Sequence, residues 1–365
     1  MHVGIVGGGI AGLATAWALA RRDIRVTLFE QAAIPNPLSA SGDQHRLIRR
    51  GYGSLDGYAR TIDDAFRAWD DMFADTGADG FVESGVLCIS ETAGDDGSEF
   101  IEGYDRMGVA YDDLPAAAAA ERFPFLDAAT FQRAAVVADG GVLLCEVITE
   151  ALVAWLEAKG VTLRAQTPVA AIDAARATVR TADGEQQFDR LVVAAGAWVT
   201  ALLPELEATL HPYRTLVTYL KPPGDLAAAW EAAPGILSVG SRRTDGYVLP
   251  PVRGTELKFG TGLTKHPGRP DPDWSPTLED GIAVRGAFAP PFARIEDYEV
   301  TGVRSCVYTF TDDETFRGFE LGRAHVVSAC SGHGYKFGAA VGLKTAEAIL
   351  SGNTRAWQSW LRAEA

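Results

Sequence analysis

The stretch VGIVGGGIAGLATAWALARRDIRVTLFE, residues 3–30, places a glycine-rich turn between two apolar segments and ends on an acid. Residues 3–6 predict a short strand, residues 13–22 a helix and residues 25–29 a second strand. The turn contains the G-x-G-x-x-G pattern, in which Gly7 allows the tight turn, Gly9 lets the backbone approach a pyrophosphate and Gly12 lets helix pack on strand. The stretch therefore predicts a Rossmann-like dinucleotide-binding unit.

The acid at the end of this stretch supports the same interpretation. Glu30 lies 18 residues after Gly12, close to the ~20 expected for a carboxylate that binds ribose hydroxyls. The helix that follows Gly9 would offer unpaired N–H groups to an anion. The alternative is a glycine-rich turn without a ligand, and the strand–helix–strand–acid context favours binding. The motif alone does not separate FAD from NAD.

Composition excludes several other classes of function. The chain has 365 residues, 47% of them hydrophobic, which predicts a large core in two domains or in one domain with a large insert. A formal net charge of −15 argues against binding to nucleic-acid phosphates or to anionic membrane surfaces. The uncharged run at residues 3–20 is rich in glycine and has no basic residue before it, so we expect no signal peptide or membrane span. A cytoplasmic protein is the expectation.

The cysteines predict neither a disulfide framework nor a zinc site. The chain has four, without a C-x-x-C pair and without a Cys/His cluster. They are Cys88, Cys145, Cys306 and Cys330.

Two later segments extend the nucleotide domain. Residues 189–198, DRLVVAAGAW, predict a strand that runs into a turn of small residues, although an ordinary strand-to-loop glycine would look the same. Residues 326–329 predict another strand, followed by the glycine loop SGHGYKFG at 331–338 and a helix at 339–350 whose N-terminus could face a developing anion. These pieces lie far apart in the sequence, so the domain must be assembled from separate segments.

The segments between them predict a second domain. Strand-rich stretches with turn signals, notably 81–90 and 210–313, suggest a largely antiparallel sheet. We expect a doubly wound α/β domain made of residues 1–80, 140–205 and 320–365. An inserted α+β substrate domain would comprise residues 81–139 and 206–319.

Five motifs, in order and with similar spacing over nearly the whole chain, resemble the monomeric sarcosine oxidase and N-methyltryptophan oxidase family of DAO-type amine oxidases. They are GIVGGGIAGLATAWALA at 4–20, HRLIRRGYG at 45–53, GYVLPPVRGTELKFG at 246–260, RSCVYTFTDDETF at 304–316 and SGHGYKFG at 331–338. The resemblance implies a monomeric FAD enzyme of the type with a two-dinucleotide-binding domain.

The resemblance also implies how FAD is held. Cys306 would form a thioether with the flavin 8α-methyl group, whereas a lone cysteine without this context would be a small core thiol. Arg304 or another cation would lower the pKa of that thiol. Arg46 and His45 are assigned to the flavin side. The remaining expected FAD contacts are Gly7, Gly9, Ile10, Ala11, Gly12, Glu30, Ser41, Val169, Ala195, Gly196, Trp198, Gly332, Gly334, Tyr335 and Lys336.

Counterparts of Arg49 and Lys336 hold the substrate carboxylate in the family, a task suited to a planar guanidinium and a point charge. The alternative is a solvated basic face, especially for Arg50. Lys258 follows Tyr247 by 11 residues, as the family's oxygen-activating lysine does. Lys265 and a solvent-facing role for Lys258 remain alternatives.

Two departures from the family pattern concern the substrate. Ser54 and Gly262 replace larger polar residues, and Tyr247 and Tyr308 remain as pocket walls. We therefore expect an amino acid bulkier than sarcosine, oxidised by hydride transfer from its α-carbon to flavin N5, with O2 reduced to H2O2. The alternatives are a dehydrogenase with a non-oxygen acceptor and a flavin-binding redox protein without turnover.

Overall fold

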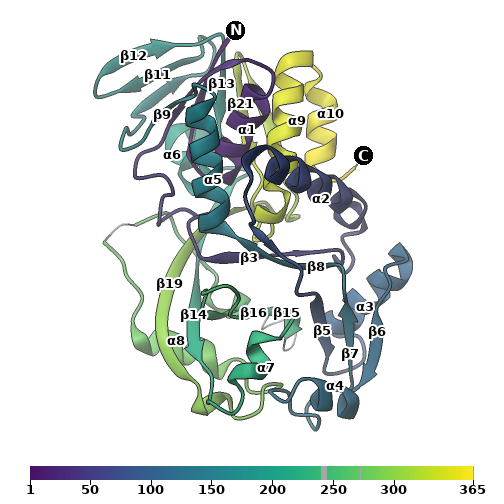
Figure 1. The fold of residues 1–365 in the computed structure, drawn as a ribbon. Helices are drawn as coiled ribbons and strands as arrows, with labels where there is room; N and C mark the ends of the chain where they lie inside the picture. The colour runs from purple at the N-terminus through teal and green to yellow at the C-terminus, as the bar shows by residue number, and fades with distance from the viewer. Residues whose placement is uncertain (240–244, 272, 365) are drawn as a thin grey trace.

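The structure is a computed structural model that describes residues 1–239, 245–271 and 273–364. Figure 1 shows two parts, one above the other. The upper part holds both chain termini and most of the long helices. The lower part holds the largest sheet, and strands β3 and β8 run across the molecule between the two parts.

The upper part is built on a six-stranded sheet. Its central strand β1 pairs in parallel with β2 and with β13, and only the edge strand β20 is antiparallel. The order is β20 (Arg317–Leu321), β21 (Ala324–Ser328), β13 (Arg190–Val193), β1 (His2–Val6), β2 (Arg25–Phe29) and β9 (Thr162–Arg164). Strands from three distant segments therefore meet in one sheet, as the sequence predicts.

Helices cover one face of this sheet. They are α1 (Ile10–Ala20), α2 (Asp56–Thr76), α5 (Cys145–Ala158), α9 (Gly338–Ser351) and α10 (Thr354–Leu361). Helix α2 shows why these segments are helical, because its buried residues recur three or four apart and form one apolar stripe. That stripe is Tyr58, Ile62, Ala65, Trp69 and Met72.

The opposite face differs from the expectation of a doubly wound domain. A three-stranded antiparallel sheet lies there in place of a second helical layer, together with the short helix α6 (Val199–Leu202). Val179 from the small sheet packs into one buried cluster with Phe29 and Leu191 of the large one. The three strands are β10 (Ala171–Asp173), β11 (Thr178–Thr181) and β12 (Gly184–Gln187).

The lower part contains a mostly antiparallel sheet. Its longest pairing joins β14 (His211–Lys221) to β19 (Glu299–Phe310), from His211 opposite Phe310 to Lys221 opposite Glu299. The other strands, in order around β14, are β18 (His266–Pro267), β17 (Leu257–Gly260), β16 (Gly246–Leu249), β15 (Gly235–Val239), β5 (Val86–Ser90), β7 (Arg133–Val137) and β6 (Asp112–Pro115). Aromatic rings fill the core beneath it, with Phe125 stacked on Trp230 at 3.9 Å between ring centroids.

Four helices accompany this sheet: α3 (Asp96–Met107), α4 (Ala116–Arg122), α7 (Ala227–Glu231) and α8 (Leu278–Gly286). A small antiparallel sheet of β3 (His45–Arg49), β8 (Gly140–Leu144) and β4 (Phe81–Val82) joins the two parts. It places the arginine-rich segment between the sheets. The expected α/β class with an antiparallel second sheet is thus confirmed, and the domain boundaries stay a prediction.

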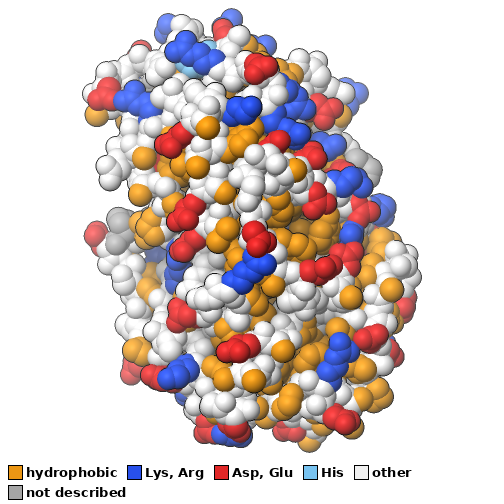
Figure 2. Space-filling model, in the orientation of Figure 1, with side chains coloured by type: hydrophobic (Ala, Val, Ile, Leu, Met, Phe, Trp, Pro, Cys, Tyr) orange, Lys and Arg blue, Asp and Glu red, His pale blue; other side chains and the backbone are white. Residues whose placement is uncertain are grey.

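The surface carries side chains of both charges. Figure 2 shows acidic and basic side chains mixed over this face of the molecule, with apolar side chains between them. No helix in the part of the chain that the structure describes is both long enough and apolar enough to cross a membrane.

Candidate active site

A cavity of about 800 Å³ runs from the glycine turn after β1 to the glycine loop before α9. Eighteen of the residues predicted from sequence line its wall. They are Gly7, Gly9, Ile10, Ala11, Glu30, Ser41, Arg46, Arg49, Val169, Ala195, Gly196, Trp198, Tyr247, Tyr308, Gly332, Gly334, Tyr335 and Lys336. Among the described residues, four of those assigned to FAD or to catalysis lie outside this wall: Gly12, Lys258, Cys306 and the fully buried His45.

The glycine turn closes one end of the cavity. Gly7 has φ of 111°, in the region that favours glycine, and its N–H donates to the Phe29 carbonyl at 2.8 Å. A Cβ on Gly12 would lie 1.9 Å from the Gly7 oxygen, so Gly12 shapes the turn from behind rather than facing a ligand. The Ile10 N–H at the start of α1 donates to Ser41 Oγ at 3.0 Å.

Glu30 braces this turn. Its Oε2 accepts from the Gly8 N–H at 2.8 Å, and its Oε1 accepts from the Ala32 N–H at 3.0 Å and from Asn36 Nδ2 at 2.9 Å. A carboxylate can accept about four hydrogen bonds, which leaves capacity for a ribose hydroxyl. The sequence analysis missed Asn36, which is polar and 3% exposed.

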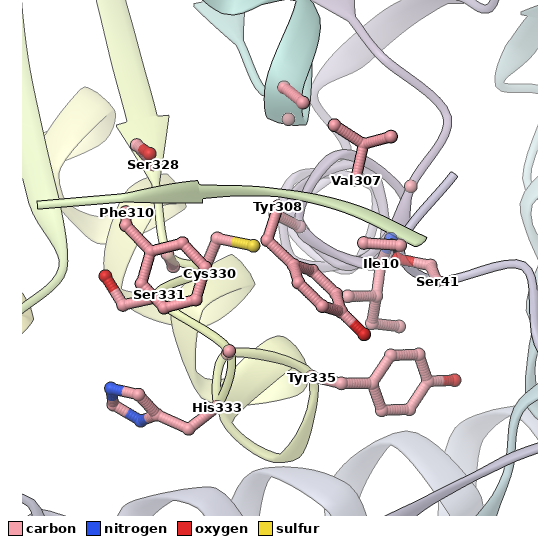
Figure 3. A pocket seen from close by; sticks show the side chains of 18 of the residues that line it. Ile10, Ser41, Val307, Tyr308, Phe310, Ser328, Cys330, Ser331, His333 and Tyr335 are labelled. Carbon is pink, nitrogen blue, oxygen red and sulfur yellow. Dashed lines mark hydrogen bonds between the residues drawn. The ribbon is translucent and has the colours of Figure 1, made fainter. Parts of the chain in front are cut away.

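The loop between β21 and α9 closes the other end. Figure 3 shows Ser331, His333 and Tyr335 of this loop around the cavity, with Tyr308 and Phe310 of β19 opposite them. His333 Nε2 donates to the Glu314 carbonyl at 3.0 Å if that nitrogen carries the proton. Burial, with the nearby cations Lys336 and Arg49, lowers the pKa of His333 to about 3.

Arg49 and Lys336 meet beside Tyr52. The Arg49 guanidinium lies over the Tyr52 ring at 4.4 Å and over the Phe100 ring at 4.8 Å. Lys336 is 7% exposed, and its Nζ donates to the His333 carbonyl at 3.1 Å. Burial, followed by the charges of Arg49 and Arg46, lowers the pKa of Lys336 well below its usual value.

Neither of these two cations forms an ion pair with a carboxylate of the described residues. The next arginine differs: Arg50 Nε lies 2.7 Å from Asp139, and its Nη1 contacts Asp63, outside the cavity. Arg49, in contrast, lines the cavity.

The Lys258 side chain is fully buried, which excludes the solvent-facing alternative. Its Nζ lies 2.8 Å from Asp43 Oδ2 and 2.6 Å from the His45 carbonyl oxygen. Arg46 Nη1 contacts the same Asp43 oxygen at 2.5 Å, and Tyr219 donates its hydroxyl to the other one. Sequence reasoning missed Asp43, although a single acid at the start of the basic segment DQHRLIRR, residues 43–50, is a signal for a counter-ion.

Lys265 lies elsewhere, at the cavity wall. Its Nζ is 3.4 Å from the centroid of the Phe310 ring and 3.7 Å from Glu314 Oε1. Its side chain is partly exposed.

Cys306 is 1% exposed and lies on β19 opposite Thr215. It shares a strand face with Tyr308, which lines the cavity. Arg304 donates to the Pro37 and Gly42 carbonyls and so ties β19 to the loop before β3. A second thiol that sequence reasoning left without a role, Cys330, is part of the cavity wall (Figure 3).

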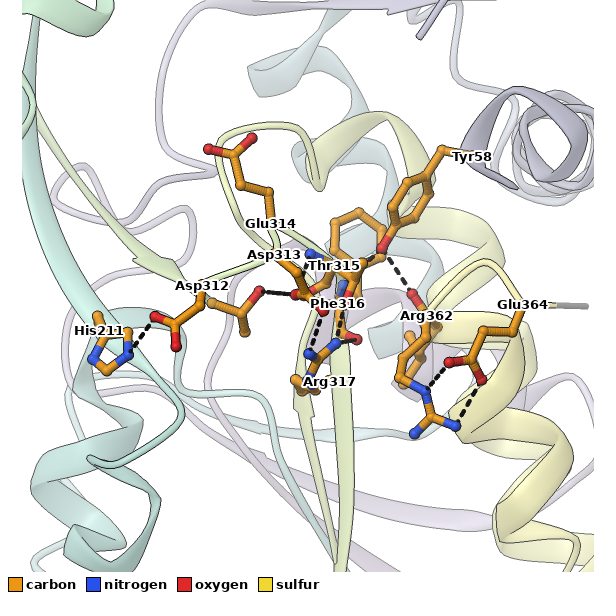
Figure 4. Close-up of polar contacts among 12 residues, drawn as sticks. Tyr58, His211, Asp312, Asp313, Glu314, Thr315, Phe316, Arg317, Arg362 and Glu364 are labelled. Atoms are coloured by element: carbon orange, nitrogen blue, oxygen red, sulfur yellow. Dashed lines mark hydrogen bonds and ion pairs between the residues drawn. The ribbon is translucent and has the colours of Figure 1, made fainter. Parts of the chain in front are cut away.

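The turn after β19 is fixed by polar contacts (Figure 4). Asp313 accepts from the Thr315 N–H at 3.1 Å and from Arg317 Nη2 at 2.7 Å. The Tyr58 hydroxyl accepts from the Phe316 N–H at 2.7 Å and donates to the Leu361 carbonyl at 2.9 Å. The turn is thereby anchored to α2 and to the C-terminal helix.

Comparison with known proteins gives a consistent result. A family model described as DAO, FAD dependent oxidoreductase, matches residues 2–348. N-methyl-L-tryptophan oxidase of Yersinia pestis (strain Pestoides F) is 27% identical over 355 residues, covering 93% of this chain and 92% of that protein.

Two solved structures share the fold. L-proline dehydrogenase from P. horikoshii has a TM-score of 0.82 at 22% identity and covers 100% of this chain and 95% of its own. NikD, described as an unusual amino acid oxidase, has a TM-score of 0.80 at 20% identity and covers 96% of this chain and 94% of its own.

Proposed function

The chain belongs to the DAO family of FAD dependent oxidoreductases, and from this premise we propose that it oxidises an amine that also carries a carboxylate. The observation that carries the proposal is the pair Arg49 and Lys336. Lys336 is buried and Arg49 is half-buried, and cations shielded from water are costly without a counter-ion. A substrate carboxylate seated between them would supply the missing charge and accept hydrogen bonds from both.

The residues at the glycine turn fit FAD. The tight turn at Gly7 and Gly12, the start of α1 and the remaining acceptor capacity of Glu30 suit a pyrophosphate and a ribose. Arg46, Tyr335 and the glycines of the loop before α9 would hold the flavin portion. When bound, FAD would supply the redox chemistry: a hydride would pass to it from the amine's α-carbon and the two electrons would go on to O2, so that amine and O2 would become imine and H2O2.

The protein's own contribution is positioning. Arg49 and Lys336 would fix the carboxylate, which orients the α-carbon in one direction. Carboxylate binding would also raise the pKa of Lys336 toward its ordinary value, so the lysine is charged when the substrate is in place. Tyr247 and Tyr308 would form the walls beside the substrate and keep water away from it.

The size of the substrate follows from two small residues. Ser54 and Gly262 both line the cavity. Apolar side chains, including Leu47, Leu237 and Phe100, line it as well. We therefore propose an amino or imino acid bulkier than sarcosine, with an apolar side chain or ring.

Cys306 is proposed as the covalent attachment point of FAD. In that reaction the S–H and one methyl C–H are replaced by a C–S bond, and the two electrons and two protons leave as H2O2 when O2 is the acceptor. Its position on the Tyr308 face of β19 supports the proposal. Arg46 is the cavity-lining cation that interacts electrostatically with Cys306.

O2 is proposed as the electron acceptor, with Lys258 as the cation that favours its reduction. One observation favours a second candidate, a dehydrogenase with another acceptor: Lys258 does not line the described cavity wall but lies behind it.

One experiment separates these functions. The FAD-loaded protein is mixed anaerobically with a panel of amino and imino acids while flavin absorbance is followed, and air is then admitted. Bleaching by a carboxylate-bearing amine, followed by fast recovery with H2O2, is the expected result. Bleaching with slow recovery in air would identify a dehydrogenase. No bleaching by any member of the panel would overturn the substrate class.

A further inference from the structure

Lys258, Asp43 and Arg46 form a buried chain of charges behind the cavity wall. Asp43 is 1% exposed, and its Oδ2 contacts Lys258 Nζ at 2.8 Å and Arg46 Nη1 at 2.5 Å. Its Oδ1 accepts from the Tyr219 hydroxyl and, at 2.7 Å, from the Gln44 N–H. Arg46 is the member that reaches the cavity. Asp43 therefore joins a cation at the wall to a cation behind it.

Asp43 is the counter-ion of Lys258. Strand β17 places it between Leu257 and Phe259, both in the core, so no solvent reaches the ammonium. Among the described residues, Asp43 is the one carboxylate that contacts it, and Arg46 is a second cation nearby. The titratable and charged groups facing Lys258 come from the loop before β3, from β3, from α5 and from β14: Asp43, His45, Arg46, Cys145 and Tyr219.

We propose that Asp43 is a positioning residue for reoxidation: it holds the Lys258 side chain as a fixed ammonium, and Lys258 promotes electron transfer to O2 only in this Asp43-bound form. The inference rests on the proposed oxidase function. The balance of charges supports it. Burial lowers the pKa of Lys258, Asp43 opposes that effect, and Arg46 adds to it.

Replacing Asp43 by Asn keeps the shape of the side chain and removes its charge. Lys258 would then be buried beside Arg46 without an anion, and its pKa would fall further. At a pH above this lowered pKa, the Lys258 side chain is neutral and the fixed cation is lost. At a pH below it, Lys258 is again an ammonium. Reoxidation in Asp43→Asn should therefore be slow at high pH and recover as the pH falls.

The test uses holoenzyme reduced with dithionite, so that no substrate is needed, and mixed with O2 in a stopped-flow instrument. At about pH 9 we expect Asp43→Asn to be ~10²-fold slower than wild type and equal to Lys258→Met. At about pH 6 Asp43→Asn should regain most of the rate, whereas Lys258→Met should not. Asp139→Asn makes the same change at a carboxylate that pairs with Arg50 outside the cavity, and this matched control should stay near wild type.

A second readout does not depend on turnover. The midpoint potential of bound FAD should show an extra proton-linked step in Asp43→Asn, because Lys258 now titrates in the accessible range. The step should be absent in wild type and in the double variant Asp43→Asn/Lys258→Met. The double variant also replaces both members of the pair, which keeps the test available if Asp43→Asn alone folds poorly.

Two results would overturn the inference: a wild-type reoxidation rate in Asp43→Asn at both pH values, or the same potential step in the double variant. Slow reoxidation of the wild-type protein itself, with no further slowing in Lys258→Met, would instead count against O2 as the acceptor. Failure of all amines to reduce the flavin would leave this dithionite experiment unaffected, so the two failures are distinguishable.

Discussion

The Glu30 carboxylate, at the end of β2, accepts a hydrogen bond from the Gly8 N–H at 2.8 Å, in the turn that follows β1. Glu30, which the sequence pattern assigns to a ribose hydroxyl, thus also supports the glycine turn at which the pyrophosphate would bind. We expect Glu30→Ala to leave the Gly8 N–H and Asn36 without their acceptor and to lower the free energy of unfolding by about 1–3 kcal/mol. Denaturant unfolding, together with FAD titration in a Cys306→Ala background, measures both effects. The exposed Glu185→Ala is the control, and equal FAD affinity with and without Glu30 would reject the ribose assignment.

Substitutions of Arg49 and Lys336 test the proposed binding site for the substrate carboxylate, with the neighbouring Arg50 as a control. Arg49→Met and Lys336→Met should each weaken binding of a carboxylate-bearing inhibitor by about 2–5 kcal/mol, because the bound anion loses a buried, charge-assisted partner. Spectral titration of the holoenzyme measures the dissociation constant. Arg50→Met is the matched control, since its guanidinium contacts Asp63 and Asp139 outside the cavity. Wild-type affinity in the Arg49 variant would show that the carboxylate binds elsewhere.

Covalent attachment can be assigned to one of two thiols. Acid-denatured wild-type protein should stay yellow, and its intact mass should exceed that of the apoprotein by one FAD. Cys306→Ser should release the cofactor on denaturation, whereas Cys330→Ser, at the cavity wall, should retain it. The opposite pattern would move the attachment to Cys330, and a colourless wild-type precipitate would end the covalent proposal.

Variants of Lys258 and Lys265 test the two half-reactions separately. Lys258→Met should slow reoxidation by O2 ~10²-fold, a loss of about 3 kcal/mol of transition-state stabilisation, and should leave anaerobic flavin reduction within a few-fold of wild type. Lys265→Met, which removes a cation from the cavity wall, should change reoxidation little. If only the Lys265 variant shows slow reoxidation, Lys265 and not Lys258 is the cation that promotes electron transfer to O2.

His333 should contribute to the pH dependence of stability. Its pKa is about 3 in the folded protein and lies near 6.5 when unfolded. As the pH falls below about 6.5, the unfolded chain binds a proton that the folded one does not, so stability decreases by up to about 1.4 kcal/mol per pH unit. His333→Phe should remove this part of the slope in denaturant titrations of the holoenzyme. An unchanged slope would mean that His333 is protonated in the folded state.

Much of the nucleotide domain could be predicted because its signals are local. The turn after β1, the start of α1 and the acid after β2 lie within 30 residues, and each follows from backbone sterics or from the spacing of apolar residues. The family motifs pointed to further residues, and many of these, such as Gly9 and Lys336, line one cavity in the structure. Sequence did not reveal that a three-stranded sheet covers the second face, because short strands such as β10 give a weak periodic signal.

What the sequence by itself determined is the dinucleotide turn, the α/β class with an antiparallel second sheet, and the residue types that chemistry on a carboxylate-bearing amine would need. The family resemblance assigns Arg49, rather than Arg50, to the carboxylate, and the tertiary structure places Arg49 at the wall of the cavity. It alone brought Asp43 to Lys258 across 215 residues of sequence. The physical reason is that burial and ion pairing are properties of groups meeting in space, and a counter-ion that arrives from another strand leaves no trace in the local pattern around either residue.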